Sequence, residues 1–299
     1  MNSFILILLC LMGLCWGSFL NVLMARTLSG ESIIFPFSKC PKCGHSLYFW
    51  HNIPIVSFLI LKGKCYFCNK TISLRYPIVE IIGLALFLFS FTKYISIFDA
   101  ISVIIALSMF IVLSYTDIKE RKISVIQTLF IILAGVVFNR YDIYNSLAGC
   151  VVGAAIVLFI SFLGKKVFNK EIFGAGDIYL LGALGSVVGF DKIFLFLVYT
   201  LIAQFVMVLP SYILSLIRAE QIKTLKYLIF FIVACLFLYF FRNISFWGSN
   251  ALLTVILGFV IFFAYHLIRN LFNTLKTGEI ASYCPLAPAV AISCIIFLC

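Results

Sequence analysis

The hydrophobic positions of this chain gather in long runs, and short polar connections separate the runs. A helix needs about 20 predominantly apolar residues to cross the ~30 Å hydrocarbon core of a bilayer. Most runs have about this length, whereas 178–190 is short and suits a thin or re-entrant helix. The predicted helices are 4–25, 77–95, 98–116, 123–139, 144–163, 178–190, 193–217, 227–241, 250–268 and 281–298.

The overall composition supports this interpretation. Of the 299 residues, 64% are hydrophobic and only 11% are charged. Soluble domains are about half apolar and about a quarter charged, so one soluble core does not explain the excess. The sequence therefore predicts an all-α polytopic membrane protein with about ten transmembrane helices.

The same pattern divides the chain into five parts. One polar segment is longer than a short connection, and it separates the first predicted helix from the second. The parts are a first transmembrane helix at 1–25, a loop at 26–76, a membrane core at 77–217, a further helix pair at 218–280 and a last transmembrane helix at 281–299.

The distribution of Lys and Arg predicts the orientation. If the N-terminus lies outside, 18 of the 22 basic residues fall on the cytosolic side, and the exceptions are Lys93, Arg140, Lys192 and Arg242. Cytosolic connections of membrane proteins carry such an excess. The loop at 26–76 is therefore predicted to be cytosolic. The net charge of +11 is mostly explained by this excess of basic residues on the cytosolic side, which would also attract anionic membrane lipid. A nucleic-acid partner is therefore not needed to explain the charge.

The loop contains two pairs of cysteines with CxxC spacing. Cys40 and Cys43 form the first pair, Cys65 and Cys68 form the second, and 21 residues lie between the pairs. Four thiolates can surround one tetrahedral zinc ion, and such a site is structural because no coordination position stays open. The cytosol keeps thiols reduced, which argues against two disulfides. Redox chemistry and coincidence are the alternatives to a cytosolic zinc-binding loop.

Three acidic residues lie at the cytosolic ends of predicted helices: Glu80, Asp117 and Asp177. Acids at such depth are costly and are functional candidates. Glu80 follows Pro77 in a first turn, where its charge suits the helix dipole and a structural role is at least as plausible as a chemical one. Asp117 and Asp177 belong to one layer, and two close carboxylates share a proton, as in aspartic proteases.

The segment around Asp177 is glycine-rich, and Gly174 and Gly176 are expected to let the backbone approach a substrate closely. A helix N-terminus favours an ionised carboxylate, whereas a helix C-terminus disfavours one. On this basis Asp177 is the predicted initial base and Asp117 the initial acid. The alternative is that Asp177 is an interfacial N-cap without chemistry.

Several short motifs occur along the chain in the same order as in a known family, and the chain therefore resembles the type IV prepilin peptidases. These are bifunctional leader peptidase/N-methyltransferases with a GxGD signature. The motifs are GSFLNV at 17–22, HNIPIVSFLILKGKC at 51–65, SLRYPIVE at 73–80, TDIKERKIS at 116–124, GAGD at 174–177 and CPLAPAVAI at 284–292. The resemblance makes Asp117 and Asp177 the catalytic pair, with Gly174, Gly176 and Glu80 as supporting residues.

The resemblance implies cleavage of the basic leader from prepilins or pseudopilins of type IV pilus or secretion systems. Cleavage would occur at the cytosolic face of the bacterial inner membrane. The second implied activity is methylation of the new N-terminus with S-adenosylmethionine, and Gly63 and Lys64 beside the zinc loop are the candidate residues for it.

The sequence also departs from the family pattern. Ile123 and Ser124 replace a usual proline, Tyr179 replaces a usual lysine, and 226–271 looks like an extra helix pair. Two other functions stay open: a different GxGD intramembrane protease, and a non-enzymatic transporter that uses the same acids. The cysteine loop argues against the first, and acids at helix ends rather than at the bilayer midplane argue against the second.

Overall fold

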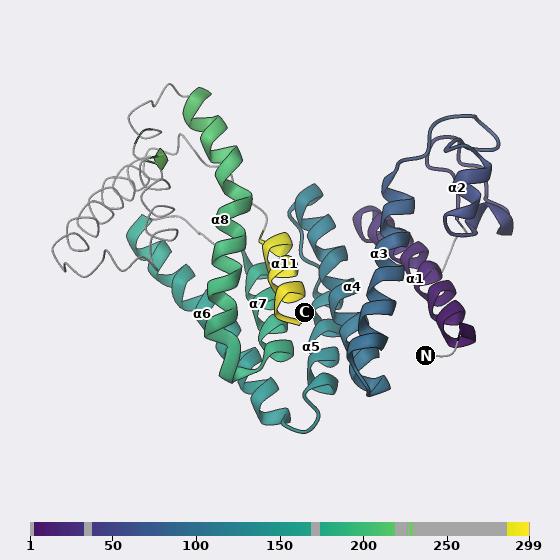
Figure 1. Cartoon of the computed structure of the whole chain (residues 1–299). Coiled ribbons are helices and arrows are strands. Elements are labelled where there is room, and N and C mark those ends of the chain that lie inside the picture. Colours follow the sequence, from purple (N-terminus) through teal and green to yellow (C-terminus); the bar gives the residue numbers. More distant parts are fainter. Residues whose placement is uncertain are drawn as a thin grey trace, which may run out of the picture. The chain divides into compact units, whose positions relative to one another are not determined.

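The computed structural model describes residues 3–32, 38–168, 174–218, 226, 228–229 and 286–298. Within these residues every regular element is a helix, and two isolated β-bridges lie in the cysteine loop (Figure 1). This confirms the predicted all-α class. The elements are α1 (Ser3–Ser29), η1 (Phe49–Asn52), α2 (Val56–Ile60), α3 (Arg75–Lys93), α4 (Ile97–Glu120), α5 (Val125–Phe138), α6 (Ile143–Phe168), α7 (Ala175–Val188), η2 (Phe190–Lys192), α8 (Ile193–Arg218) and α11 (Ala287–Leu298).

The chain is a membrane protein, but the predicted number of about ten passes is only partly supported. Among the described residues, α1, α3, α4 and α6 are each long and apolar enough to span a bilayer. Helix α7 and the segment 190–204 together make a fifth candidate, bent by 107°. The break follows from Gly189, which has a φ of +81° and ends α7 after 14 residues. The predicted helices 227–241 and 250–268, and nearly all of the predicted pair at 218–280, lie outside the described residues.

The chain forms two compact units, Met1–Ala203 with Pro285–Cys299, and Gln204–Cys284. In the first unit α4 is the central helix, because it packs against α1, α3, α5 and α11. Of its 18-residue apolar window, 61% is buried inside the protein, against 22% for α1 and for α6. Phe110 and Leu113 of α4 are fully buried in the main hydrophobic core. Helix α4 is therefore the element around which the site is built.

Glycines allow two helix pairs to pack with their backbones in contact. A Cβ atom added to Gly83 of α3 would lie 2.5 Å from the carbonyl oxygen of Gly13 and 2.6 Å from the Cα atom of Gly17, both in α1. In the pair formed by α6 and α7, a Cβ atom on Gly185 would lie 2.0 Å from the carbonyl oxygen of Gly149. Small residues permit this kind of close helix approach in membranes.

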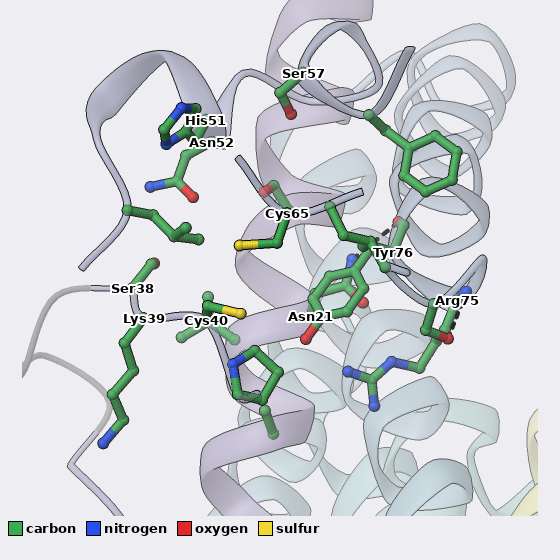
Figure 2. A pocket seen from close by; sticks show the side chains of 18 of the residues that line it. Asn21, Ser38, Lys39, Cys40, His51, Asn52, Ser57, Cys65, Arg75 and Tyr76 are labelled. Atoms are coloured by element: carbon green, nitrogen blue, oxygen red, sulfur yellow. Dashed lines mark hydrogen bonds between the residues drawn. The ribbon is translucent and has the colours of Figure 1, made fainter. Parts of the chain in front are cut away.

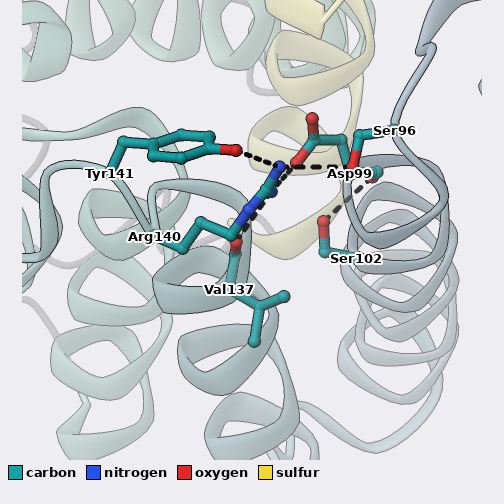
Figure 3. Close-up of polar contacts among 6 residues, drawn as sticks. All are labelled: Ser96, Asp99, Ser102, Val137, Arg140 and Tyr141. Atoms are coloured by element: carbon teal, nitrogen blue, oxygen red, sulfur yellow. Dashed lines mark hydrogen bonds and ion pairs between the residues drawn. The ribbon is translucent and has the colours of Figure 1, made fainter.

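A polar cluster ties the first turn of α4 to the connection between α5 and α6 (Figure 3). Arg140 forms an ion pair with Asp99 and donates hydrogen bonds to Ser96 Oγ at 3.2 Å and Tyr141 Oη at 3.3 Å. Both charged side chains are about three-quarters buried, at 27% and 24% exposure. The cluster fixes the end of α4 opposite to Asp117, so both ends of this helix are anchored.

The α1–α3 contact generates a stability prediction. We expect Gly83→Ala to lower the free energy of unfolding by about 1–3 kcal/mol, because its methyl group would meet backbone atoms that cannot move aside. Gly182→Ala is the matched control, since its Cβ atom would meet its nearest neighbour at an ordinary 3.4 Å. The measurement is thermal unfolding of both variants in detergent. Equal melting temperatures for the two would contradict the packing described for α1 and α3.

Candidate active site and cysteine cluster

Asp117 lies in the last turn of α4 and is 6% exposed. Its Oδ2 atom accepts a hydrogen bond of 3.0 Å from the backbone N–H of Ala287, the first residue of α11. The first N–H groups of a helix have no acceptor within the helix, and the dipole favours an anion there. The carboxylate of Asp117 therefore caps α11, a helix 170 residues away in sequence.

Asp177 lies in the first turn of α7, and its Oδ2 atom accepts a hydrogen bond of 3.0 Å from the backbone N–H of Gly174. Gly174 is therefore the N-cap residue, and Asp177, the third residue of α7, bonds back to it. Gly176 packs closely, but against Ile123: an added Cβ atom would lie 2.9 Å from the Cβ atom of Ile123. An added Cβ atom on Gly174 would lie 3.9 Å from Oδ2 of Asp177. The close approach at Gly176 therefore joins α7 to the connection after α4.

The two carboxylates lie close enough for their charges to interact. Each also accepts a backbone N–H at a helix N-terminus: Asp117 from Ala287 of α11, and Asp177 from Gly174, the residue that precedes α7. The predicted division into base and acid considered only the C-terminal end of α4. Because α11 offers Asp117 a positive helix end as well, the helix dipoles alone do not separate the two roles.

The four loop cysteines converge, and all of their Sγ atoms lie within 4.8 Å of one another. Two knuckles with the same geometry bring them together. In each knuckle the first cysteine donates its N–H five residues ahead, to the carbonyl of His45 or Lys70, at 2.9 Å. A residue with positive φ closes each turn, Gly44 at 73° and Asn69 at 54°. Lys42 Nζ joins the knuckles by donating to the carbonyl of Thr71 at 3.0 Å.

The electrostatics of this cysteine cluster suit a metal. The hydrogen bond from the backbone N–H of Cys68 lowers the pKa of the Cys65 thiol most strongly. Burial raises this pKa, a hydrogen bond from the backbone N–H of Phe67 lowers it, and the resulting pKa is about 7. For Cys43 the backbone N–H of His45 acts in the same direction, but burial and the neighbouring thiols outweigh it and raise the pKa to about 11. Thiols that crowd one another in this way cannot all ionise unless a cation joins them.

Glu80 lies in α3, is 8% exposed, and accepts a hydrogen bond of 2.7 Å from the backbone N–H of Ile55. Ile55 has a φ of +60° and a ψ of −48°, and the N–H of Val56 bonds to the carbonyl of Pro54 at 2.6 Å. This is a tight γ-turn, and a β-branched residue with positive φ in it is strained. Glu80 therefore has the structural role of holding the cysteine loop against α3.

A cavity of about 1230 Å³ lies between the cysteine loop and helices α1, α3 and α4 (Figure 2). Asn21, Arg75 and Tyr115 all line this cavity. The signal for Asn21 and Arg75 was their place in GSFLNV and SLRYPIVE. Gly63 and Lys64 are not among the described residues that line it. Gly63 has a φ of +68° and packs under the ring of Phe58.

Comparison with known proteins identifies two matching regions. Residues 11–94 match the bacterial peptidase A24 N-terminal domain, and residues 104–209 match the type IV leader peptidase family. The chain is 33% identical over 193 residues to the prepilin leader peptidase/N-methyltransferase of Klebsiella pneumoniae, covering 61% of this chain and 85% of that protein. It is 30% identical to the protein of the same name from Neisseria gonorrhoeae, covering 64% and 77%.

A third relative with this name, from Myxococcus xanthus, is 35% identical over 184 residues. That match covers 60% of this chain, and the chain spans only 55% of the relative's length. No solved structure matches the chain.

The contact between Glu80 and Ile55 generates a prediction about local order. We expect Glu80→Ala to open the turn at 54–56 to limited proteolysis and to speed hydrogen exchange of the Ile55 amide, because the acceptor is lost. Glu80→Gln is the matched control, since its amide oxygen still accepts the N–H. Cleavage patterns of Glu80→Ala and wild type that coincide would show that Glu80 does not hold the loop.

Proposed function

Because the chain belongs to the type IV leader peptidase family, we propose that it is a membrane aspartic endopeptidase that removes the leader from prepilins or pseudopilins. The proposal is supported by the placement of two acids at neighbouring helix ends. Asp117 accepts a hydrogen bond from the start of α11, Asp177 accepts one from Gly174 before α7, and their charges are close enough to influence each other. Alternatives such as another GxGD intramembrane protease or a transporter are not favoured, because the cysteine cluster and both matching regions agree with the leader peptidases.

In the proposed reaction the aspartate pair shares one proton. The ionised carboxylate takes a proton from a water molecule while the water oxygen attacks the carbonyl carbon of the scissile peptide. The protonated carboxyl donates its proton to the carbonyl oxygen. When the carbon–nitrogen bond breaks, the amine takes a proton from the pair, and a hydroxyl of the tetrahedral intermediate returns a proton to the pair. A carboxylic acid, a free amine and the starting one-proton pair result. The backbone donors of Ala287 and Gly174 hold each carboxylate in place throughout.

The substrate class follows from the position of the aspartates at helix ends. A prepilin has a short basic leader in water and an apolar helix in the membrane, so its cleavage site lies at the boundary between them. Asp117 is in the last turn of α4 and Asp177 in the first turn of α7. The charge distribution supports a cytosolic position for this layer, in the inner membrane of a bacterium. The partners are then the precursor and membrane lipid, and no nucleic acid is involved.

The cysteine cluster is proposed to hold a structural zinc ion. In a tetrahedral site with zinc–sulfur bonds of about 2.3 Å, sulfur atoms lie about 3.8 Å apart. The Sγ atoms within 4.8 Å of one another fit this geometry, and the donor set of four thiols fits zinc. Zinc, when bound, cross-links the two knuckles. Cys40, Cys43, Cys65 and Cys68 would orient the loop and have no part in bond breaking.

The second proposed activity is N-methylation of the new N-terminus. S-adenosylmethionine, when bound, supplies a methyl group to the neutral amine nitrogen; the electrons of the broken carbon–sulfur bond stay on sulfur, and the amine proton leaves to water. Gly63 and Lys64 stay candidates through their place beside Cys65. Their described role is a left-handed turn under Phe58 and a β-bridge from Lys64 to Thr71.

The dyad prediction uses a prepilin and purified protein in detergent. We expect Asp117→Asn and Asp177→Asn each to reduce the cleavage rate at least roughly a hundredfold, because an amide neither accepts nor shares the proton. Both variants keep the size and an acceptor oxygen of the side chain, so they should unfold at temperatures near that of wild type. Cleavage that survives in both variants would refute the aspartic mechanism.

The metal prediction rests on the convergence of the four thiols. We expect one zinc ion per chain by elemental analysis of purified protein, and loss of that zinc in Cys65→Ala with greater protease sensitivity of the loop. Cys15→Ala is the control, because Cys15 lies in α1 and outside the cluster. A fully active preparation that contains no metal would contradict a structural role for zinc.

A further inference from the structure

Lys93 is one of the four basic residues that the charge distribution predicts on the side of the membrane opposite to the aspartate pair. It lies in the last turn of α3, where its Nζ atom donates a hydrogen bond to the backbone carbonyl of Leu298, the last residue of α11. The ammonium group also lies 5.5 Å from the centroid of the Phe89 ring, one turn back in α3. The Lys93 side chain is therefore directed at the end of a helix 205 residues away in sequence.

Tyr94 contacts the same carbonyl group. Its hydroxyl donates to the carbonyl oxygen of Leu298 at 3.4 Å. The backbone of Tyr94 is anchored, because its N–H ends α3 by bonding to the carbonyl of Ser90 at 3.0 Å, and its ring packs edge-on against Phe138 of α5. The connection from α3 to α4 thus offers the C-terminal end of α11 a cation and a hydroxyl on a fixed backbone.

Both contacts suit a helix C-terminus in an apolar environment. The last carbonyl groups of a helix have no N–H partner within that helix, and the dipole favours a cation beside them. Leu298 is 4% exposed and belongs to the main hydrophobic core, so its carbonyl needs donors from the protein. At the other end of α11, the carboxylate of Asp117 accepts the N–H of Ala287. Helix α11 therefore has an acid at its N-terminus and a cation at its C-terminus.

These end contacts determine where α11 lies along its own axis. The helix packs against α4 (Figure 1), and most of the side chains that it buries are small: Ala287, Ala289, Val290, Ala291, Ser293 and Cys294. Apolar contacts between such side chains are not directional. The hydroxyl of Ser293 donates within α11, to the carbonyl of Ala289 at 2.9 Å. The directional contacts described between α11 and other helices therefore lie at its two ends.

We propose that Lys93 is a positioning residue for the aspartate pair, an inference that rests on the proposed peptidase activity. By holding the C-terminal end of α11, Lys93 keeps the N–H of Ala287 within hydrogen-bond reach of Asp117 at the opposite end. The helix has 12 residues and is about 18 Å long, so it moves as one short rod. The contact to Asp117 measures 3.0 Å, and a displacement of about 1 Å along the axis would break it.

The expected consequence is a slower chemical step with unchanged binding. Lys93 lies at the end of α11 opposite to Asp117, so it does not touch the reacting atoms. A carboxyl group that has lost its fixed donor spends less time in the geometry for proton transfer, which lowers kcat. The surface that receives the precursor keeps its residues, so KM stays nearly constant.

The test measures prepilin cleavage by the purified full chain in detergent. We expect Lys93→Met to lower kcat roughly tenfold with KM within about twofold of wild type, because methionine keeps an apolar stem and has no donor. Lys93→Arg should restore kcat to within about twofold, since a guanidinium also donates to a carbonyl. Thr92→Val is the matched control, because the hydroxyl of Thr92 donates within α3, to the carbonyls of Leu88 and Phe89.

Hydrogen exchange of the Ala287 amide measures the position of α11 without cleavage. We expect exchange roughly tenfold faster than wild type in Lys93→Met and near the wild-type rate in Lys93→Arg, from mass spectrometry of fragments that contain the start of α11. Wild-type exchange in Lys93→Met overturns the inference, because Lys93 then does not hold the helix. Faster exchange with unchanged kcat also overturns it, because the contact then has no effect on the reaction.

The two measurements separate this inference from the peptidase proposal. If the wild type does not cleave prepilin, the peptidase proposal fails, and with it the role of Lys93 in cleavage, while the exchange rates still decide whether Lys93 holds α11. If Lys93→Met does not fold, Lys93→Gln replaces it, because glutamine keeps a donor but loses the charge and the reach of lysine. Exchange at Ala287 faster than wild type in Lys93→Gln supports the inference, and exchange at the wild-type rate overturns it.

Discussion

The constraint on which the structure depends is the burial of the Asp117 carboxylate, which needs hydrogen-bond donors in place of water. Asp117 is nearly fully buried and accepts a hydrogen bond from the first residue of α11. A buried charge is tolerated only when donors surround it, and a helix N-terminus supplies donors and a favourable dipole together. Because the donor comes from the last described helix, the site cannot form until chain segments 170 residues apart have met.

The central position of α4 follows from this requirement. One face of the helix presents Asp117 to α11, and the other presents Tyr115 to the cavity beside the cysteine loop. Backbone contacts at glycines hold the neighbouring helix pairs, α1 with α3 and α6 with α7, as stiff units. In this arrangement helix α4 lies between the contact of Asp117 with α11 and the cavity beside the cysteine loop.

Much of the site could be predicted from local sequence. The spacing of the cysteines was sufficient to predict the cluster. The acid after a glycine turn indicated a helix start, although the N-cap residue is Gly174, and Asp177 in the first turn bonds back to it. The sequence shows that Asp117 lies at the C-terminal end of a helix. It does not show the contact with Ala287, which lies 170 residues away, so the hydrogen-bond partner of Asp117 was not predictable. Similarly, the packing of Gly176 against Ile123 was not predictable, because only folding brings the two residues together.

The short apolar run at 178–190 was predicted to be a thin or re-entrant helix, and the structure agrees with this. Gly189 ends α7 after 14 residues, and α7 meets the following segment at 107°, as in a broken span or a re-entrant loop. The turn at Ile55, in contrast, gave no signal, because nothing in the sequence marks an isoleucine for a positive φ. Local rules describe caps and metal knuckles well, and they miss contacts that depend on tertiary packing.

The most direct test of the central claim is a cross-link between the two aspartate positions. In Asp117→Cys/Asp177→Cys, a short bifunctional thiol reagent should join residues 117 and 177, and mass spectrometry of the peptides identifies the product. Ile118→Cys/Asp177→Cys should give little of it, because Ile118 is 57% exposed on α4 and is not buried beside α11 as Asp117 is. Equal yields from both pairs, or no product from the first, would contradict a catalytic site built from Asp117 and Asp177.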